Sequence, residues 1–213
     1  MSLSPQEYAY TNSALGHHHA YLTTPLLALL PSSSSHTKKL KVLDLGCGNG
    51  SLSHYIAQVG YEVVGVEDSA SGVQIAAQNS PDCHFIHASI YDLPYAQLEH
   101  SFDAVLAVEV IEHLIYPREL LRAAKRCLKP EGKLILTTPY HGYLKNLLLA
   151  LSGKMDQHFT VLWDGGHIKF FSVATLSRLL KEEGFDSLQF KFTGRSPYLW
   201  KSMLCSAVLA SEI

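Results

Sequence analysis

Short apolar runs alternate with amphipathic segments along the chain from Lys41 onward. Apolar runs bounded by turn residues are typical of buried strands, whereas apolar positions spaced three and four residues apart indicate helices. The pattern predicts strands at Val42–Leu45, Glu62–Val66, Cys83–His87, Asp103–Val108, Lys133–Thr138, Ser187–Thr193 and Met203–Leu209. It predicts helices at Leu52–Val59, Ser69–Asn79, Pro117–Leu128 and Val173–Glu183, with a turn at Lys129–Gly132 before the fifth strand.

Strands that alternate with helices form βαβ units, which build a mostly parallel sheet covered on both faces. We therefore expect an α/β protein with a doubly wound sheet. Residues 1–40 are expected to form an N-terminal helical cap, and residues 41–213 a single domain. An insertion at about 139–171 interrupts the pattern after the fifth strand, and long insertions at strand ends usually serve a function.

Composition and charge narrow the class of protein. The 213 residues are 47% hydrophobic and 17% charged, which excludes a disordered chain, and the formal charge of -2 argues against a duplex-DNA binder. The four cysteines lie far apart, which argues against a disulfide scaffold. No lysine or arginine precedes Lys38, and no apolar run approaches the ~20 residues of a membrane span. We expect a soluble, cytoplasmic protein.

A glycine-rich turn, Asp44-Leu-Gly-Cys-Gly-Asn-Gly50, directly follows the first predicted strand. In open α/β sheets, ligands bind at the carboxyl ends of the strands, and glycine lets the backbone approach a ligand closely. A dinucleotide fingerprint would require a third glycine at position 51, where this chain has Ser51. A P-loop would require a Gly-Lys-Ser/Thr ending, and no lysine is near. Both phosphate-binding interpretations are therefore disfavoured.

A carboxylate stands at the end of the second predicted strand, 17 residues after Gly50. At this place Glu67 can accept hydrogen bonds from both hydroxyls of a ribose. The neighbouring Asp68 could serve instead, or it could only help Ser69 to cap the next helix.

Four segments, VLDLGCGNG, VVGVED, FDAVLAVEVIEHL and LKPEGKLILTTP, stand in this order between Lys41 and Gly184. Together they resemble a class I S-adenosylmethionine (SAM)-dependent methyltransferase. The resemblance implies a Rossmann-like, doubly wound, mostly parallel seven-stranded sheet with helices on both faces. It also implies SAM as the cofactor, with its methionine part on the glycine loop and its ribose on the acid of the second strand.

The same resemblance implies the residues that bind the cofactor. They are Asp44, Gly46, Cys47, Gly48, Asn49, Gly50, Glu67, Asp68, Ser89, Ile90 and Val108. Ser89 and Ile90 would flank the adenine, and Val108 would contact the cofactor through its backbone. The N-terminal cap lacks the arginine that related enzymes place near the SAM carboxylate, so Asn12 or His19 are candidates for that role.

The segment Glu109-Val-Ile-Glu112-His113 carries two carboxylates and an imidazole at the end of the fourth predicted strand. If a helical turn starts there, residues i, i+3 and i+4 share one face, so Glu109, Glu112 and His113 would converge. With His167 at the end of the insertion, they would form a site for a divalent cation such as Mg²⁺. The alternatives are a base or pocket role for His113 and a purely structural role.

Two further features belong to the predicted substrate side. His141 follows the fifth strand, where it would act as a catalytic base, as His113 could, or as a pocket wall. The apolar run 143–151 predicts an amphipathic helix, either a lid packed over the active site or a lip that contacts a membrane or a lipid-tailed substrate.

The combined prediction is a methyltransferase that acts on a hydroxyl of a small or lipid-linked acceptor, with or without a divalent ion. The subgroup that it resembles most is the ubiquinone-biosynthesis O-methyltransferases, which act on catechol-like hydroxyls. Three alternatives stay open: an RNA 2′-O-methyltransferase, a nicotinamide oxidoreductase and a non-catalytic SAM-binding module. The net charge of -2 counts against the first, and Ser51 counts against the second.

Overall fold

A computed structural model describes residues 8–14, 16, 19–32, 39–159 and 161–210. Its strands are β1 Lys41–Leu45, β2 Glu62–Glu67, β3 His84–His87, β4 Phe102–Val108, β5 Leu128–Pro139, β6 Phe185–Thr193 and β7 Ser202–Leu209. Its α-helices are α1 His19–Leu27, α2 Ser51–Gln58, α3 Ala70–Asn79, α4 Tyr95–Leu98, α5 Pro117–Cys127, α6 Tyr143–Leu151, α7 Met155–Phe159 and α8 Val173–Glu182. A short 3₁₀ helix, η1, covers Ile111–His113.

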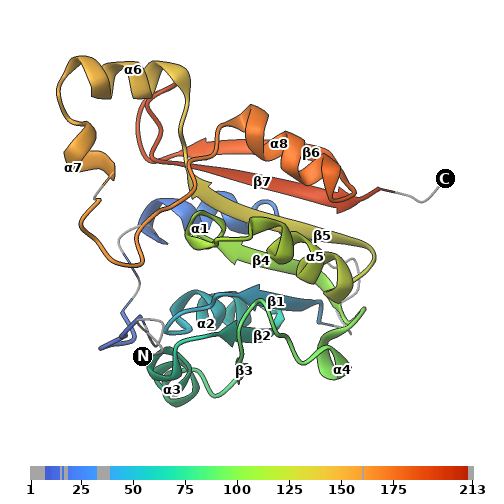
Figure 1. The fold of residues 1–213 in the computed structure, drawn as a ribbon. Helices are drawn as coiled ribbons and strands as arrows, with labels where there is room; N and C mark the ends of the chain where they lie inside the picture. The colour runs from blue at the N-terminus through green and yellow to red at the C-terminus, as the bar shows by residue number, and fades with distance from the viewer. Residues whose placement is uncertain (1–7, 15, 17–18, 33–38, 160, 211–213) are drawn as a thin grey trace, which may run out of the picture.

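The seven strands form one mixed sheet in the order β3-β2-β1-β4-β5-β7-β6 (Figure 1). β1 to β5 pair in parallel, and β7 is antiparallel to both of its neighbours. The strand order reverses between β1 and β4, and their carboxyl ends are the place where open α/β sheets bind ligands. The expected α/β, mostly parallel, doubly wound sheet is therefore confirmed.

Alternate side chains of each strand bury on opposite faces of the sheet, as the period of two requires. Leu43 belongs to the core that α4, α5 and α8 cover, whereas the preceding Val42 belongs to the core that α1 and α2 cover. In Figure 1, α5 and α8 cross the near face of the sheet, and α1 lies behind it. The helices thus cover both faces, and the site is left to the loops at the carboxyl edge.

Local sequence signals account for several helix ends. The hydroxyl of Ser69 caps α3 by accepting a hydrogen bond from the Gly72 amide at 3.2 Å. Ser172 and Thr175 form a capping box at the start of α8. Gly184 follows α8 with φ +86°, a left-handed conformation that glycine adopts without steric cost.

One expectation about local structure is wrong. Strand β5 begins at Leu128, and the expected turn at Lys129–Gly132 is an irregularity within the strand, because pairing with β4 resumes at Lys133. Helix α6 exposes several of its apolar residues, with Tyr143 84% and Leu151 75% exposed, whereas its Lys145 is buried. Figure 1 shows α6 and α7 projecting beyond the sheet.

Candidate functional site

The glycine turn after β1 folds back onto the end of β2. The amides of Gly46 and Cys47 donate to the carbonyl oxygen of Val66 at 2.8 and 3.1 Å. Gly46, Gly48 and Gly50 have φ of +75°, +56° and +73°, values that other residues rarely adopt. The turn therefore requires glycine at these positions, and it lies at the carboxyl edge of the sheet.

Glu67, the last residue of β2, is tied to the glycine turn through its carboxylate. One oxygen accepts from the Gly48 amide and the other from the Ser69 amide, both at 2.9 Å. Burial raises the pKa of Glu67 above its usual value, and the two amides oppose that shift. An ionised carboxylate has about four acceptor positions, so two remain for a ligand. Asp68 is exposed, and its backbone carbonyl oxygen accepts from His87, so Glu67 is the better placed of the two acids.

The first described segment of the chain crosses this site. Its backbone is held by Ser69, whose hydroxyl donates to the Tyr8 carbonyl at 2.6 Å, and by Ser71, whose hydroxyl accepts from the Tyr10 amide. The Tyr10 ring lies so close to Gly48 that a Cβ there would approach the Tyr10 hydroxyl to 2.7 Å. Burial, and then the Glu67 charge, raise the pKa of Tyr10. Tyr10 could not be found from the sequence, because no local motif relates it to a loop almost forty residues away.

Three other residues of the glycine turn support the loop. Asp44 is buried, accepts from the Ser53 hydroxyl at 2.6 Å, and has its pKa raised by burial to about 6. Cys47 is also buried, and burial raises its pKa. The Asn49 amide donates to the carbonyl oxygen of Asn12 at 2.8 Å and so fastens the N-terminal segment. The side chain of His19, the other candidate for the SAM carboxylate, lies outside the described residues.

The predicted adenine side lies at the end of β3. Ser89 and Ile90 form a half-buried turn in which the Ser89 carbonyl oxygen accepts from the Asp92 amide at 3.0 Å. The Ala88 amide joins this turn to the end of β2 by donating to the Glu67 carbonyl oxygen. Val108 ends β4 and is nearly buried between the two halves of the sheet. The structure thus places these residues around the same edge as Glu67.

A second cluster lies beyond the end of β4. The structure brings ligand atoms of Glu112, His113 and His167 within 4.8 Å of one another. The insertion is joined to η1 because the amides of Ile168 and Lys169 both donate to the Glu112 carbonyl oxygen. His113 donates from Nδ1 to the Gly165 carbonyl at 2.9 Å, which leaves its Nε2 free to accept.

Glu112 is the unusual member of this cluster. Its side chain is fully buried, and neither carboxylate oxygen has a hydrogen-bond partner among the described residues. Burial, and then the charge of Glu109, raise its pKa well above the usual range. A buried carboxylate without partners is costly unless a proton or a cation accompanies it.

Glu109 does not join the cluster, contrary to the expectation from the sequence. The helical turn starts only at Ile111, and Glu109 itself adopts a left-handed φ of +54°. Its carboxylate accepts instead from the Thr137 hydroxyl of β5 at 2.8 Å. The expected convergence of residues i, i+3 and i+4 requires an α-helix that includes position 109, and no such helix forms there.

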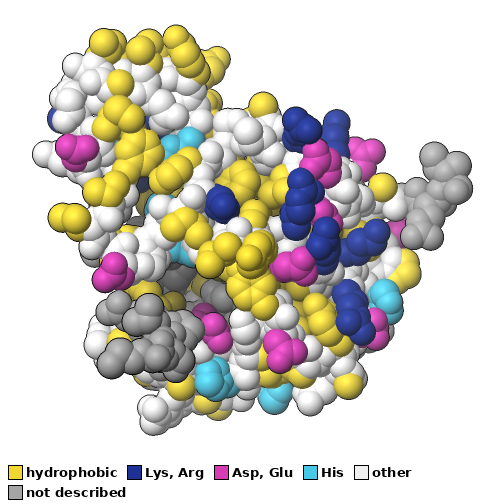
Figure 2. Space-filling view, viewed as in Figure 1, with side chains coloured by type: hydrophobic (Ala, Val, Ile, Leu, Met, Phe, Trp, Pro, Cys, Tyr) yellow, Lys and Arg dark blue, Asp and Glu magenta, His cyan; other side chains and the backbone are white. Residues whose placement is uncertain are grey.

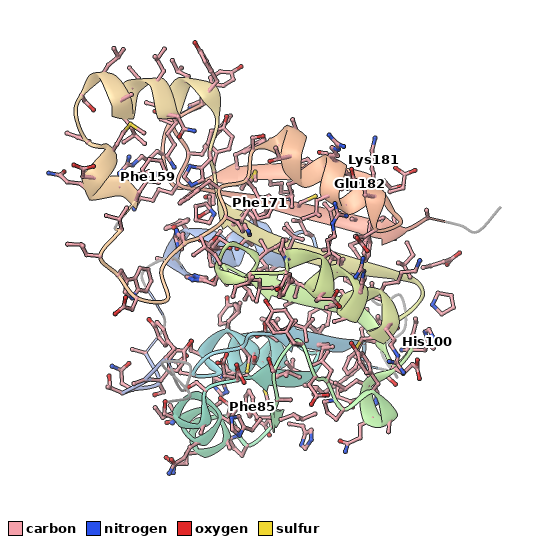
Figure 3. All side chains as sticks on the ribbon, in the orientation of Figure 1. Phe85, His100, Phe159, Phe171, Lys181 and Glu182 are labelled. Carbon is pink, nitrogen blue, oxygen red and sulfur yellow. The ribbon has the colours of Figure 1, made fainter. Side chains whose placement is uncertain are left out.

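A cavity of about 210 Å³ opens at the end of β5, next to this cluster. Its lining comes from β5, the insertion and the β6–β7 loop: Pro139, His141, Lys145, His158, His167, Phe170, Arg195 and Lys201. His141 is buried, and its ring stacks on that of Phe159, which Figure 3 labels on α7. Burial, and then the nearby Lys145, lower the pKa of His141 to about 4. Lys145 lines the same cavity and is only 6% exposed.

An open, mostly parallel sheet with a glycine turn after β1 and a half-buried acid at the end of β2 defines a Rossmann-like nucleoside-binding protein. Residues 15–189 match the family model described as "Methyltransferase domain", so the chain belongs to this family. It is a domain of the SAM-dependent methyltransferase class, and the family implies SAM as the methyl donor.

Known proteins similar to this chain agree with that assignment. A mitochondrial ubiquinone biosynthesis O-methyltransferase of Schizosaccharomyces pombe is 30% identical over 68% of this chain and 54% of its own length. A ubiquinone biosynthesis O-methyltransferase of Ruegeria pomeroyi is 29% identical over 76% of this chain and 66% of its own. The chain thus spans about half to two thirds of these relatives. The YcgJ protein of Bacillus subtilis, 17% identical, shares the fold with a TM-score of 0.69 over 92% of this chain and 100% of its own.

Proposed function

We propose that this domain transfers the methyl group of SAM to a hydroxyl of a small acceptor bound in the cavity at the end of β5. The observation that carries the proposal is this cavity, because it opens at the same carboxyl edge of the sheet as the predicted cofactor site and is lined by three imidazoles. The ubiquinone biosynthesis O-methyltransferases among the relatives are consistent with a hydroxyl acceptor. SAM supplies an activated methyl group, so the protein has to align the acceptor and help to remove its proton.

The histidines differ in how well they suit the role of base. The low pKa of His141 makes it neutral but weakly basic at neutral pH, which fits a hydrogen-bond acceptor that orients the hydroxyl. His113 has a free Nε2 and a fixed tautomer, which is the arrangement expected of a general base or a metal ligand.

Glu112, His113 and His167 would hold a divalent cation, and the residues fit that role. The unpartnered oxygens of Glu112 need a positive charge, and the Gly165 carbonyl orients the His113 ring as metal-binding histidines require. Two imidazoles and one carboxylate suit Mn²⁺, Fe²⁺ or Zn²⁺ better than Mg²⁺. A bound cation would lower the pKa of the acceptor hydroxyl.

The outward face of α6 suits a lipid surface or a lipid-linked acceptor. Five apolar side chains of α6 are exposed: Tyr143, Leu147 and Leu151, which follow one another at helical spacing, and Leu144 and Leu148 beside them. Figure 2 shows hydrophobic side chains along the outer edge of α6. Among the described residues, no helix has the length and apolar character needed to cross a membrane. The contact would be made by the apolar face of α6, as amphipathic helices do at a lipid surface.

The test is a methyl-transfer screen with labelled SAM over catechols, polyprenyl phenols, sugars and short RNA. We expect label on a catechol or phenol oxygen. Label on nitrogen or on RNA, or no transfer by protein that binds SAM, would contradict the proposal. The cation is tested separately, because we expect a chelator to abolish transfer and Glu112→Gln to reproduce the loss. Full turnover in both cases would exclude the cation and leave the hydroxyl acceptor standing.

A further inference from the structure

The acceptor cavity has an unusual concentration of positive charge. Lys145 from α6 and Arg195 from the β6–β7 loop both line it, as does Lys201. A second cavity of about 160 Å³ shares Lys145, His158 and Arg195 with the first and adds the apolar side chains of Leu148, Leu149 and Leu199. No carboxylate appears among the residues that line either cavity.

These cations are not neutralised within the described part of the chain. The amine of Lys145 is buried and donates to the Tyr140 carbonyl oxygen at 2.7 Å, and no ion pair is formed by Lys145, Arg195 or Lys201. By contrast, Arg118 and Arg122 on α5 each pair with Glu183. Burial, and then the charge of Arg195, lower the pKa of Lys145 to about 8. Glu109 acts in the opposite direction and only partly compensates.

Burying a cation without a counter-ion is unfavourable, and two neighbouring cations repel each other. An anionic group in the cavity would remove both costs. We propose that Lys145 and Arg195 form a subsite for an anionic group of the acceptor, a carboxylate or a phosphate. This inference rests on the proposed function and adds the substrate class to it.

The placement of the subsite gives it a role in orienting the acceptor. β5 lies two strands from β1, which corresponds to about 10 Å at the usual strand spacing. An acceptor anchored by its anion at Arg195 can therefore direct its far side toward the cofactor edge. Its apolar substituents would lie against Leu148, Leu149 and Leu199 in the second cavity.

The test measures binding before any reaction. The full chain, loaded with S-adenosylhomocysteine, is titrated with benzoate, phenyl phosphate and the neutral benzyl alcohol in a calorimeter. We expect one of the two anions to bind more tightly than the alcohol, and the better anion identifies the group. Arg195→Gln, at an exposed position where folding should be unaffected, should weaken that anion by about 10- to 150-fold, the range for a lost charge-assisted bond. Lys154→Met, at an exposed lysine of the 139–171 insertion that lines neither cavity, is the control and should change nothing.

Two outcomes would overturn the subsite: equal binding of anions and alcohol, or an unchanged preference in Arg195→Gln. Loss of S-adenosylhomocysteine affinity in Arg195→Gln would also overturn it, because the arginine would then serve the cofactor. A kinetic comparison separates the subsite from the proposed function. With 3,4-dihydroxybenzoate the variant should raise KM, whereas with catechol KM should stay constant. Benzoate binding without any methylation of hydroxyls would refute the proposed function and leave the subsite in place.

Discussion

The replacement Glu67→Gln tests whether the carboxylate at the end of β2 binds the ribose. In the structure two of its acceptor positions serve the amides of Gly48 and Ser69, and two remain. Glutamine keeps the shape but turns one oxygen into a donor. At least one charge-assisted hydrogen bond to a ribose hydroxyl is then lost, at about 1.5–3 kcal/mol. The affinity for SAM should therefore fall by about 10- to 150-fold.

The assay is calorimetric titration with SAM, with Asp68→Asn as the matched control. Asp68 is adjacent and exposed, and its carboxylate makes no hydrogen bond that the structure records, so its replacement should change the affinity by less than about twofold. Thermal unfolding of both variants shows whether the glycine turn is still formed. An unchanged affinity in a folded Glu67→Gln protein, or an equal loss in both variants, would refute the assignment.

Three more predictions follow from burial, strain and exposure. Gly50→Ala should lower the free energy of unfolding, measured in urea, by about 2–5 kcal/mol, because φ is +73° and the new Cβ would lie 2.6 Å from that of Ala76. A decrease below about 1 kcal/mol would contradict this. Asp44 has its pKa raised from 3.8 to about 6, so the stability gained by its protonation is complete below pH 4 and lost as the pH rises through 6, by about 3 kcal/mol. About 2 kcal/mol of this loss falls between pH 4.5 and 7, and Asp44→Asn should remove it from denaturation curves at these two pH values. An equal loss in the variant would contradict the assignment. Leu151→Glu should reduce the fraction of protein that sediments with phosphatidylcholine vesicles, whereas Val59→Glu, at an exposed apolar residue outside α6, should not. Equal behaviour of the two variants would exclude α6 as the contact.

The sheet could be predicted from the sequence because its signals are local. Each strand, such as Glu62–Glu67, is a short apolar run with a turn at its end, and the parallel arrangement follows from the helices between the strands. The irregularity in β5 could not be predicted in this way. Pro130 and Gly132 indicate a stop in any local analysis, and only pairing with Phe102 and Ala104 of β4 keeps the segment in the sheet.

In the candidate site, too, residues from neighbouring segments could be predicted from the sequence, and residues from distant segments could not. The glycine turn and Glu67 belong to one βαβ unit, β1–α2–β2, and their spacing alone predicts that they meet. Tyr10, Lys145 and Arg195 reach the site from distant segments, which no local pattern connects. The direction of α6 is a similar case, because periodicity defines an apolar face but not whether that face turns inward.

The central claim is that the glycine turn and Glu67 hold SAM, and a crystal structure with S-adenosylhomocysteine tests it most directly. The account predicts both ribose hydroxyls within hydrogen-bond distance of the Glu67 carboxylate and the amino-acid part beside Gly46 and Gly48. A ligand seated elsewhere, with the carboxylate still engaged only by backbone amides, would contradict it.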